Sequence, residues 1–326
     1  IKFEEAGCEM NVSTIPDQDV MDELLNTTKN TDDRDDLMTQ GHKTTEGSHS
    51  SVNGSLENEL KQLESISPMN QNISTDDEQD LVSIIMPAYN CGNCIGESIE
   101  SCQAQGWKNW ELIIMDDCST DNTAEVVARY QNEDKRVRYF TLSENSGAAV
   151  ARTRAMRIAT GRYIAFLDSD DLWHPDKLER QIAFMKANQY DFSCTDYSSI
   201  DEDGEPTGKV IKCKKRASYN DILLTCPVGN STVIYDVESL GKFEVPNIRK
   251  RNDDALWLQI LKKTEYIYGL NETLMFYRIR EASLSRNKFD LVKYHWKLYR
   301  EIEHLSVVRS VFHIVCWGFI KLFGIK

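Results

Sequence analysis

The feature that most constrains this fold is an alternation of short, continuously apolar runs with longer segments of helical spacing. The apolar runs have strand length and occupy residues 81–86, 110–115, 137–142 and 163–167. The segments between them occupy residues 95–105, 121–131 and 147–159. Uninterrupted apolar runs are typical of parallel strands buried on both faces, which need crossover connections. The pattern therefore predicts an α/β fold with a doubly wound, mostly parallel sheet flanked by helices.

Polar residues follow three of these predicted strands at the point where each strand ends, in residues 87–90, 116–121 and 168–171. Ligands bind doubly wound sheets at the carboxyl ends of the strands, so the three loops are expected to form one site. A group of carboxylates there requires a counter-charge, and its hard oxygen atoms suit Mg²⁺ or Mn²⁺. A second interpretation is that Asp121 and Asp171 cap the helices that follow them.

The first 80 residues have a different composition from the rest of the chain. They carry a net charge of −14, which equals the formal net charge of the whole chain. They are rich in polar residues and poor in aromatic ones, so we expect residues 1–80 to be a disordered acidic tail. The acidic charge balance therefore describes this tail and not the folded part. Neither a Walker loop nor a basic stripe appears, and we expect no nucleic-acid partner.

The chain has nine cysteines, an odd number without a compact framework, which indicates reduced thiols in the cytoplasm. Cys91 and Cys94 form a CxxC pair, but no second pair follows, so a metal or redox role is the weaker interpretation. We find neither a secretory signal nor an apolar run of the ~18 to 20 residues needed to span a bilayer.

The last forty residues combine apolar and basic positions. Residues 291–304 predict an amphipathic helix, and residues 307–323 predict a second, strongly apolar one. The second helix is interrupted by charges, which favours a place in the membrane interface with Trp317, Phe319 and Phe323 at the headgroup level. The alternative is that this helix packs on the catalytic domain.

Read together, the strand-end motifs resemble those of the family 2 glycosyltransferases, which have the GT-A fold. The resemblance rests on VSIIMPAYN, WELIIMDDCSTDNT and the long SENSGAAVARTRAMRIATGRYIAFLDSDDLWHPDKLERQ segment. It is close over residues 81–185 and looser to about residue 290, where RNDDALWLQILKK and YRIREASLSRNK resemble bacterial polysaccharide-assembly members. This resemblance implies a metal-dependent, inverting transfer of a sugar from a UDP-sugar to an acceptor hydroxyl.

The resemblance also implies the roles of the donor-site residues. The nucleotide-binding residues at the end of the first strand would be Pro87, Ala88 and Tyr89. Either Asp116 or Asp117 would hydrogen-bond the uracil, and Arg152 would lie near the base or the diphosphate. Asp168 and Asp170 form a DxD motif, in which Asp170 would ligate Mg²⁺ or Mn²⁺ and Asp168 would face the ribose or donor sugar. Thr153 stands where the family often has Asn.

The catalytic base implied by the resemblance is a carboxylate at the start of a helix beneath the acceptor. Alignment on the later Leu-Trp pair gives Asp253, with Asp254 as the alternative and Asn252 in place of the usual acid. Both acids could also simply cap their helix. Arg278 and Arg280 would reach the diphosphate, or else lie exposed on a strand.

These predictions divide the chain into an acidic tail (1–80), a nucleotide-sugar-binding half (81–190), an acceptor-binding half (191–288) and a C-terminal helical segment (289–326). The acceptor would be a saccharide, or a saccharide linked to polyprenyl diphosphate, used at the inner face of the cell membrane. The basic run 212–216 is either a solvated loop or a contact for such an anionic acceptor. A catalytically inactive module that binds a nucleotide-sugar or a partner is the alternative function. A nucleotidyltransferase is disfavoured, because no glycine-rich loop follows the first strand.

Overall fold

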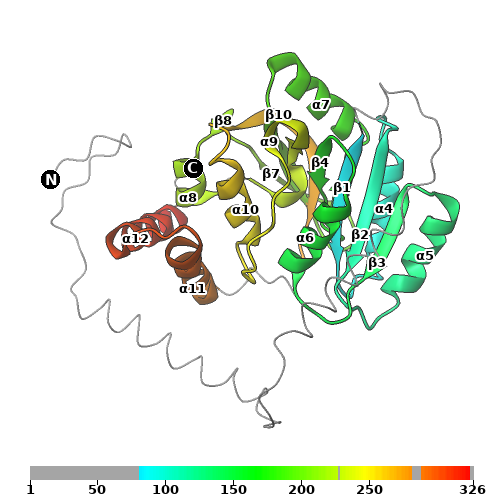
Figure 1. Cartoon of the computed structure of the whole chain (residues 1–326), viewed down its shortest axis with the longest axis horizontal. Helices are drawn as coiled ribbons and strands as arrows, with labels where there is room; N and C mark the ends of the chain where they lie inside the picture. The colour runs from blue at the N-terminus through cyan, green and yellow to red at the C-terminus, as the bar shows by residue number, and fades with distance from the viewer. Residues whose placement is uncertain (1–80, 227, 281–287, 324–326) are drawn as a thin grey trace, which may run out of the picture. The chain divides into compact units, whose positions relative to one another are not determined.

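The computed structural model describes residues 81–226, 228–280 and 288–323, with side chains described for residues 291–320 of the last range (Figure 1). The tail predicted for residues 1–80 lies outside the described residues. A ten-stranded sheet has the order β3-β2-β1-β4-β9-β6-β10-β5, with β7 paired to β6 and β8 paired to β10.

The first four strands confirm the predicted parallel sheet. They are β1 (Val82–Ala88), β2 (Trp110–Asp116), β3 (Val137–Thr141) and β4 (Tyr163–Phe166), and they pair with one another in parallel. The helices between them are α4 (Ile95–Gln103), α5 (Thr123–Glu133) and α6 (Ala148–Ile158). Strand β1 shows why the runs are continuously apolar, since Ile85 faces the core under α6 while Ile84 and Met86 face the core under α4.

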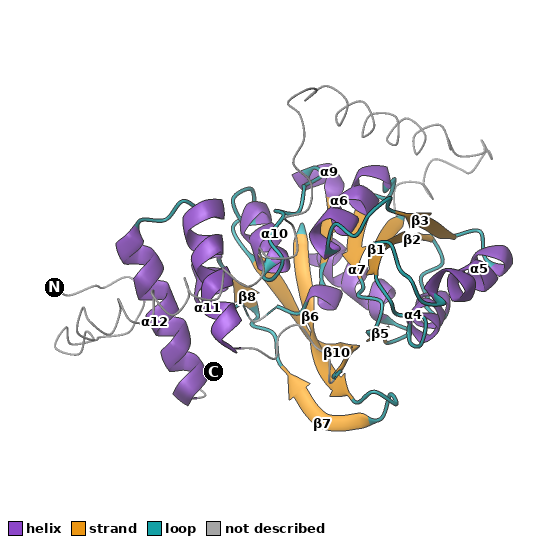
Figure 2. Ribbon diagram, turned by 90° about the horizontal axis from the view of Figure 1, so that it is seen from below, coloured by secondary structure: helices purple, strands orange, loops and turns teal. Residues whose placement is uncertain are grey.

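The second half of the sheet mixes strand directions, which the sequence patterns did not indicate. Strand β9 (Ile234–Asp236) lies between β4 and β6 (Phe192–Ile200) and is antiparallel to both. Strand β10 (Ile267–Arg278) is parallel to β6. The short strands β5 (Leu172–Trp173), β7 (Pro206–Ile211) and β8 (Arg216–Ala217) add antiparallel pairs (Figure 2). The helical elements here are α7 (Lys177–Asn188), α8 (Tyr219–Thr225), η3 (Asn230–Thr232), α9 (Val237–Leu240) and α10 (Asn252–Ile260).

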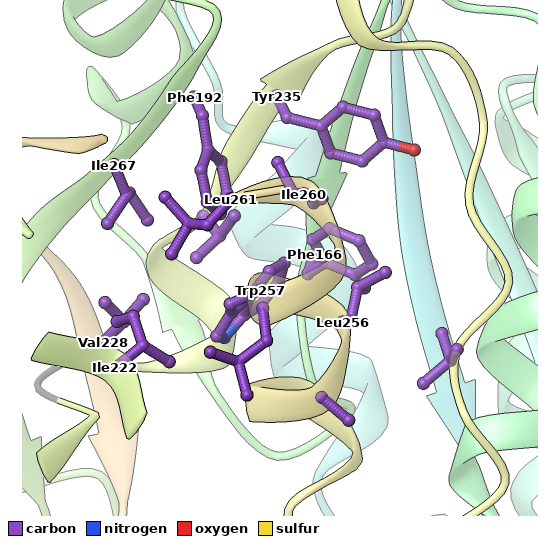
Figure 3. Packing of buried hydrophobic residues seen from close by; sticks show 14 of the residues in the cluster. Phe166, Phe192, Ile222, Val228, Tyr235, Leu256, Trp257, Ile260, Leu261 and Ile267 are labelled. Atoms are coloured by element: carbon purple, nitrogen blue, oxygen red, sulfur yellow. The ribbon is translucent and has the colours of Figure 1, made fainter. Parts of the chain in front are cut away.

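Helix α10 is anchored by Trp257, which is fully buried at the centre of a hydrophobic cluster (Figure 3). Its ring packs edge-on against Phe166 of β4, with centroids 5.2 Å apart, and lies 5.7 Å from the ring of Phe192 of β6. Aromatic contacts of this kind contribute about 1 kcal/mol each beyond area burial. The cluster fixes the start of α10, and hence residues 252–254, relative to the end of β4.

The C-terminal segment consists of α11 (Lys288–Lys297), a π-helical turn (Leu298–Ile302) and α12 (Val307–Phe323). Helix α12 buries Ser310, His313 and Trp317 against the rest of the protein. The prediction that Trp317 lies at a lipid headgroup level is therefore wrong, because its ring packs 4.5 Å from that of His295 on α11. The opposite face remains exposed and includes Val308 and Phe312, at 79% and 54%, together with Phe319 at 50%.

None of the helices in the described ranges is long and apolar enough to cross a membrane. The eight cysteines of these ranges are free thiols, as predicted. Cys91 and Cys94 are both buried, and burial raises the pKa of each. Neither thiol is therefore poised to react.

Candidate functional site

The acidic loop that follows β4 is held by residues from the second half of the chain. The backbone N–H of Asp168 donates to Ser231 Oγ at 3.0 Å, and Asn230 Nδ2 donates to Asp168 Oδ1 at 2.8 Å. Both partners belong to the short helix η3, which comes directly before β9. Because β9 pairs with β4, the sheet topology itself brings η3 to the end of β4.

Arg152 connects this loop to the start of helix α10. From α6, its Nη2 donates to Asp168 Oδ1 at 2.6 Å and its Nη1 donates to Asn252 Oδ1 at 2.6 Å. Its side chain is mostly buried, so both charge-assisted hydrogen bonds are shielded from water. The planar guanidinium therefore sets the distance between the first Asp of the DxD motif and the residue beside Asp253.

Asp171 is fully buried and does not cap a helix. The interpretation of Asp171 as the cap of the helix that follows it is therefore wrong. Its Oδ2 accepts from Ser231 Oγ at 2.6 Å, and its Oδ1 accepts from the backbone N–H of Arg278 at 3.1 Å. Helix α7 begins well beyond it, with Asp176 at the N-cap position. Burial, followed by the charges of Asp170 and Asp168, raises the pKa of Asp171 well above its usual value. Asp171 thus connects the acidic loop to β10.

Asp121 lies at the start of α5. Its carboxylate accepts a hydrogen bond from the backbone N–H of Thr123 at 3.0 Å, although the N-cap residue of α5 is Asn122.

The carboxylate of Asp170 is held more weakly by protein groups than the carboxylates of Asp168 and Asp171. Its closest cation is Arg280, with Nη1 and Oδ2 3.6 Å apart, and its side chain is partly exposed. Burial and the charge of Asp168 raise the pKa of Asp170. A divalent cation would relieve this repulsion, so the residues fit the expected metal. Asp168 already accepts from Arg152 and Asn230, so Asp170 is the better ligand.

The described residues contain no group of three or more His, Cys, Asp or Glu side chains that could hold a metal ion. Mg²⁺ is usually bound in proteins by one or two carboxylates, with water and substrate phosphate oxygens completing its shell. The open carboxylate of Asp170, with Asp168 beside it, therefore suits a metal that is shared with a diphosphate.

Arg278 and Arg280 lie in different environments. Arg278 is buried, and its guanidinium donates to Asp170 O at 3.0 Å, Glu202 O at 2.8 Å and Glu97 Oε2 at 2.6 Å. These contacts join the acidic loop to α4 and to the β6–β7 turn. The side chain of Arg280 is one-third exposed and lies beside Asp170. Of the two, Arg280 is therefore better placed to meet a ligand.

The predicted nucleotide-binding residues gather at the ends of β1 and β2. Tyr89 is half exposed there, and two neighbouring residues adopt left-handed backbone conformations, Asn90 at φ 47° and Cys118 at φ 63°. Pro87 and Ala88 end β1, and both are buried.

The two carboxylates at the end of β2 have separate partners. Asp117 accepts from the N–H groups of Ser146 and Gly147, each at 2.7 Å, and so holds the start of α6. Asp116 accepts from the N–H of Ser119 at 2.9 Å and from the hydroxyl of Tyr139. A carboxylate oxygen can accept a second hydrogen bond, so both acids keep capacity for a ligand.

The two acids at the start of α10 also differ in their surroundings. Asp254 is buried and forms an ion pair with Arg251, a residue held in the left-handed region at φ 67°. Burial raises the pKa of Asp254 to about 7, although the positive charge of Arg251 acts to lower it. Asp253 is partly exposed and directly follows Asn252, the partner of Arg152. Asp254 thus has a structural partner, and Asp253 is the acid available to a substrate.

The sequence analysis missed four residues of this site, namely Glu97, Asn230, Ser231 and Asn252. For Asn252 it missed the hydrogen bond that this side chain accepts from Arg152. All four lie outside the strand-end motifs. Only Asn252 carried a signal, as a departure from the usual acid. Asn230 Oδ1 and Arg152 Nε are buried without a hydrogen-bond partner among the described residues, so the network retains polar capacity beside Asp168.

Residues 83–245 match the family model described as "Glycosyl transferase family 2". The putative teichuronic acid biosynthesis glycosyltransferase TuaG of Bacillus subtilis is 45% identical over 241 residues, which cover 74% of this chain and 94% of that protein. The Escherichia coli UDP-Glc:alpha-D-GlcNAc-diphosphoundecaprenol beta-1,3-glucosyltransferase WfgD is 41% identical over 218 residues, 66% of this chain and 84% of that protein.

Among solved structures, S. aureus TarS 1–349 in complex with UDP-GlcNAc superposes with a TM-score of 0.56 at 20% sequence identity. The match covers 73% of this chain and 71% of that chain. At this level of identity the likeness concerns the fold, and it agrees with the predicted GT-A arrangement.

Proposed function

Since the chain belongs to glycosyl transferase family 2 and is a glycosyltransferase, we propose that it transfers a sugar from a UDP-sugar to an acceptor hydroxyl with inversion at the anomeric carbon. The observation that carries this proposal is the bridge made by Arg152. It holds the DxD loop, where a diphosphate would be bound, at a fixed distance from Asp253, where an acceptor hydroxyl would be deprotonated.

On the donor side, Tyr89 and Asp116 or Asp117 would bind the uracil, while Asp168 would orient the ribose or the sugar. Asp170 would hold Mg²⁺ or Mn²⁺, which when bound supplies positive charge to the leaving diphosphate. Arg280, 3.6 Å from Asp170, would bind the same phosphates as they separate from the sugar.

On the acceptor side, the carboxylate of Asp253 would remove the proton of the attacking hydroxyl. The hydroxyl oxygen would then form a bond to the anomeric carbon from the face opposite UDP, and the bond to the diphosphate oxygen would break. Asn252, through its bond to Arg152, would orient Asp253 without adding charge next to it.

We further propose that this transfer belongs to bacterial cell-surface polysaccharide synthesis. Two named relatives support this, a putative teichuronic acid glycosyltransferase and an enzyme whose acceptor is a sugar on diphosphoundecaprenol. The acceptor of this chain would accordingly be a saccharide linked to polyprenyl diphosphate, which is used at a membrane surface.

The exposed face of α12 suits such a surface. Val308, Phe312 and Phe319 form an apolar stripe, and Arg309 is exposed beside it. We propose that this face contacts a bilayer containing anionic lipid. Phe312→Ser with Phe319→Ser should reduce cosedimentation with vesicles of phosphatidylglycerol, whereas the exposed Val210→Ser on β7 should not. An equal reduction of vesicle cosedimentation in the double variant and in Val210→Ser would contradict the proposed contact of α12 with the bilayer.

The donor assignment is tested by calorimetric titration with UDP, with and without Mn²⁺. Wild type and the exposed-residue control Asp203→Ala should bind UDP in a metal-dependent manner, and Asp170→Ala should lose that dependence. Release of UDP from a UDP-sugar by wild type would then separate an active enzyme from an inactive binding module. Metal-independent binding that survives in Asp170→Ala would refute the assigned metal site.

A further inference from the structure

The side-chain amide of Asn230 is oriented by its neighbours and leaves one buried atom without a partner. Its Nδ2 donates to Asp168 Oδ1 at 2.8 Å, and the same oxygen accepts from Arg152 Nη2 at 2.6 Å. Because that oxygen acts as an acceptor, the amino group of Asn230 must face it and the carbonyl oxygen must point elsewhere. Asn230 is 9% exposed, and its Oδ1 has no hydrogen-bond donor among the residues that the structure describes. A buried acceptor of this kind is costly unless a donor reaches it.

The orientation of this amide is fixed by the way in which η3 is held. Ser231 Oγ, one residue along, accepts from the backbone N–H of Asp168 at 3.0 Å. On the other side, a methyl group added at Gly229 would lie 3.1 Å from Tyr197 Cε1, so the backbone packs directly against that ring. A flip of the amide would place Asn230 Oδ1 against the Asp168 oxygen, which is an acceptor as well. Asn230 Oδ1 is therefore a preorganised acceptor beside the DxD loop.

The chemistry of a UDP-sugar limits which of its groups could satisfy this acceptor. Phosphate oxygens are themselves acceptors, so a bound diphosphate would not supply the missing donor. The donors common to all UDP-sugars are the uracil N–H and the hydroxyl groups of the ribose and of the transferred sugar. The uracil is proposed to lie at the end of β2, with Asp116 or Asp117. The group that suits Asn230 Oδ1 is therefore a hydroxyl.

The strand order favours the hydroxyl groups of the sugar over those of the ribose. Neighbouring strands follow the order β2-β1-β4-β9, and η3 directly precedes β9. A donor that runs from a base at β2 to a diphosphate at the loop after β4 would have its ribose between the two, over β1. The transferred sugar lies beyond the diphosphate, away from β2, and η3 is on that side of β4.

We infer that Asn230 is a specificity-determining residue whose carbonyl oxygen accepts a hydrogen bond from one hydroxyl group of the donor sugar. This inference rests on the proposed function, because it assigns the sugar side of the same donor site. Arg152 Nε is also buried without a partner among the described residues, and as a donor it suits the oxygen of a hydroxyl group. A sugar that lacks this hydroxyl leaves Asn230 Oδ1 buried and unpaired, so the site discriminates against the corresponding deoxy sugar.

The test measures donor binding by calorimetry in the presence of Mn²⁺ and without an acceptor. UDP-glucose, UDP-galactose and UDP-N-acetylglucosamine are first compared on wild type, and the UDP-sugar that binds most tightly is kept as the parent. Its analogues replace one sugar hydroxyl at a time by hydrogen, or by fluorine, which cannot donate a hydrogen bond. The proteins are wild type, Asn230→Ala, and the control Asn188→Ala, in which the lost amide is exposed on α7 and donates to a backbone carbonyl.

We expect replacement of one particular hydroxyl, by hydrogen or by fluorine, to weaken binding to wild type and to Asn188→Ala about ten-fold. The same replacement should not change the affinity of Asn230→Ala, which should bind the parent UDP-sugar as weakly as wild type binds the analogue. UDP itself should bind all three proteins alike.

The inference is overturned if wild type binds the parent and all analogues equally, or if the fluorine analogues bind as well as the parent. It is also overturned if Asn230→Ala weakens UDP and every analogue by one common factor, because Asn230 would then only hold Asp168. Absence of Mn²⁺-dependent UDP binding in wild type would instead count against the proposed function.

Discussion

The two halves of the sheet organise their polar residues in different ways. In residues 81–190 the carboxylates of the candidate donor site follow the strands directly, so a parallel order of strands is enough to collect them. In residues 191–280 the polar side chains of the site come from η3, from the start of α10 and from the end of β10, and they contact the first half through hydrogen bonds. The first half supplies the carboxylates of the candidate donor site, and the second half holds them in position. Changes at the strand-end carboxylates should therefore affect donor binding, and changes at the residues that join the two halves or begin α10 should affect geometry and chemistry.

The largest expected effect separates chemistry from binding at α10. Asp253→Asn should reduce the rate of sugar transfer about 1000-fold, because the amide cannot accept the acceptor proton. Metal-dependent UDP binding should remain close to wild type, since Asp253 lies outside the donor residues. Transfer assays and calorimetry on the same preparation check both. A variant that lost UDP binding to the same extent as transfer would place Asp253 in the donor site.

The neighbouring acid should respond in the opposite manner. Asp254→Asn removes the counter-charge of Arg251, a partly buried cation in a left-handed backbone conformation. Loss of one partner of such an ion pair costs about 3 kcal/mol of unfolding free energy. Urea denaturation should show this loss, and Asp253→Asn should change stability by less than about 1 kcal/mol. Similar stabilities of the two variants would contradict the structural role of Asp254.

The bridge between the halves is tested by Arg152→Lys, which keeps the charge and removes the fork of donors. A single ammonium cannot hold Asp168 and Asn252 in the same fixed geometry. The rate of transfer should fall about 10- to 100-fold, since a small misplacement of reacting groups is costly. The affinity for UDP should fall much less. The matched exposed substitution Arg129→Lys on α5 should leave both quantities unchanged.

The smallest expected effect concerns the pH dependence of stability, through the buried Lys177. Burial lowers the pKa of the Lys177 ammonium on α7 to about 7, from an ordinary value of 10.5. Between these values the unfolded chain binds more protons than the native one, so Lys177 makes stability rise with pH. The rise should be about 1 kcal/mol per pH unit between about pH 8 and about pH 9. It should be absent in Lys177→Met, as judged by urea denaturation at each pH. An unchanged slope would show that the lysine does not titrate there.

The same contrast explains what the sequence could predict. The four parallel strands and the DxD loop were predictable because continuous apolar runs and strand-end acids are local signals. The insertion of β9 between β4 and β6 was not, because three residues of strand carry no indication of their neighbours. Asn230 and Ser231 depend on that insertion and were missed for the same reason. The prediction for Trp317 was wrong because the sequence of an apolar helix does not distinguish an aromatic side chain that contacts lipid from one that packs inside the protein. In this structure Trp317 packs against His295.

The position of β9 has a consequence for how such a chain can be divided or recombined. A fragment that ended at residue 190 would leave β4 without one of its two neighbours and would leave Asp168 without Asn230 and Ser231. Residues 81–190 therefore do not form an independent structural unit. A chimera that takes its second half from another glycosyltransferase must bring side chains that fit Arg152 and the β4 edge of this one. If the acceptor binds at the start of α10, as proposed, changes around that segment should alter acceptor specificity with less damage to the fold than exchange of whole halves.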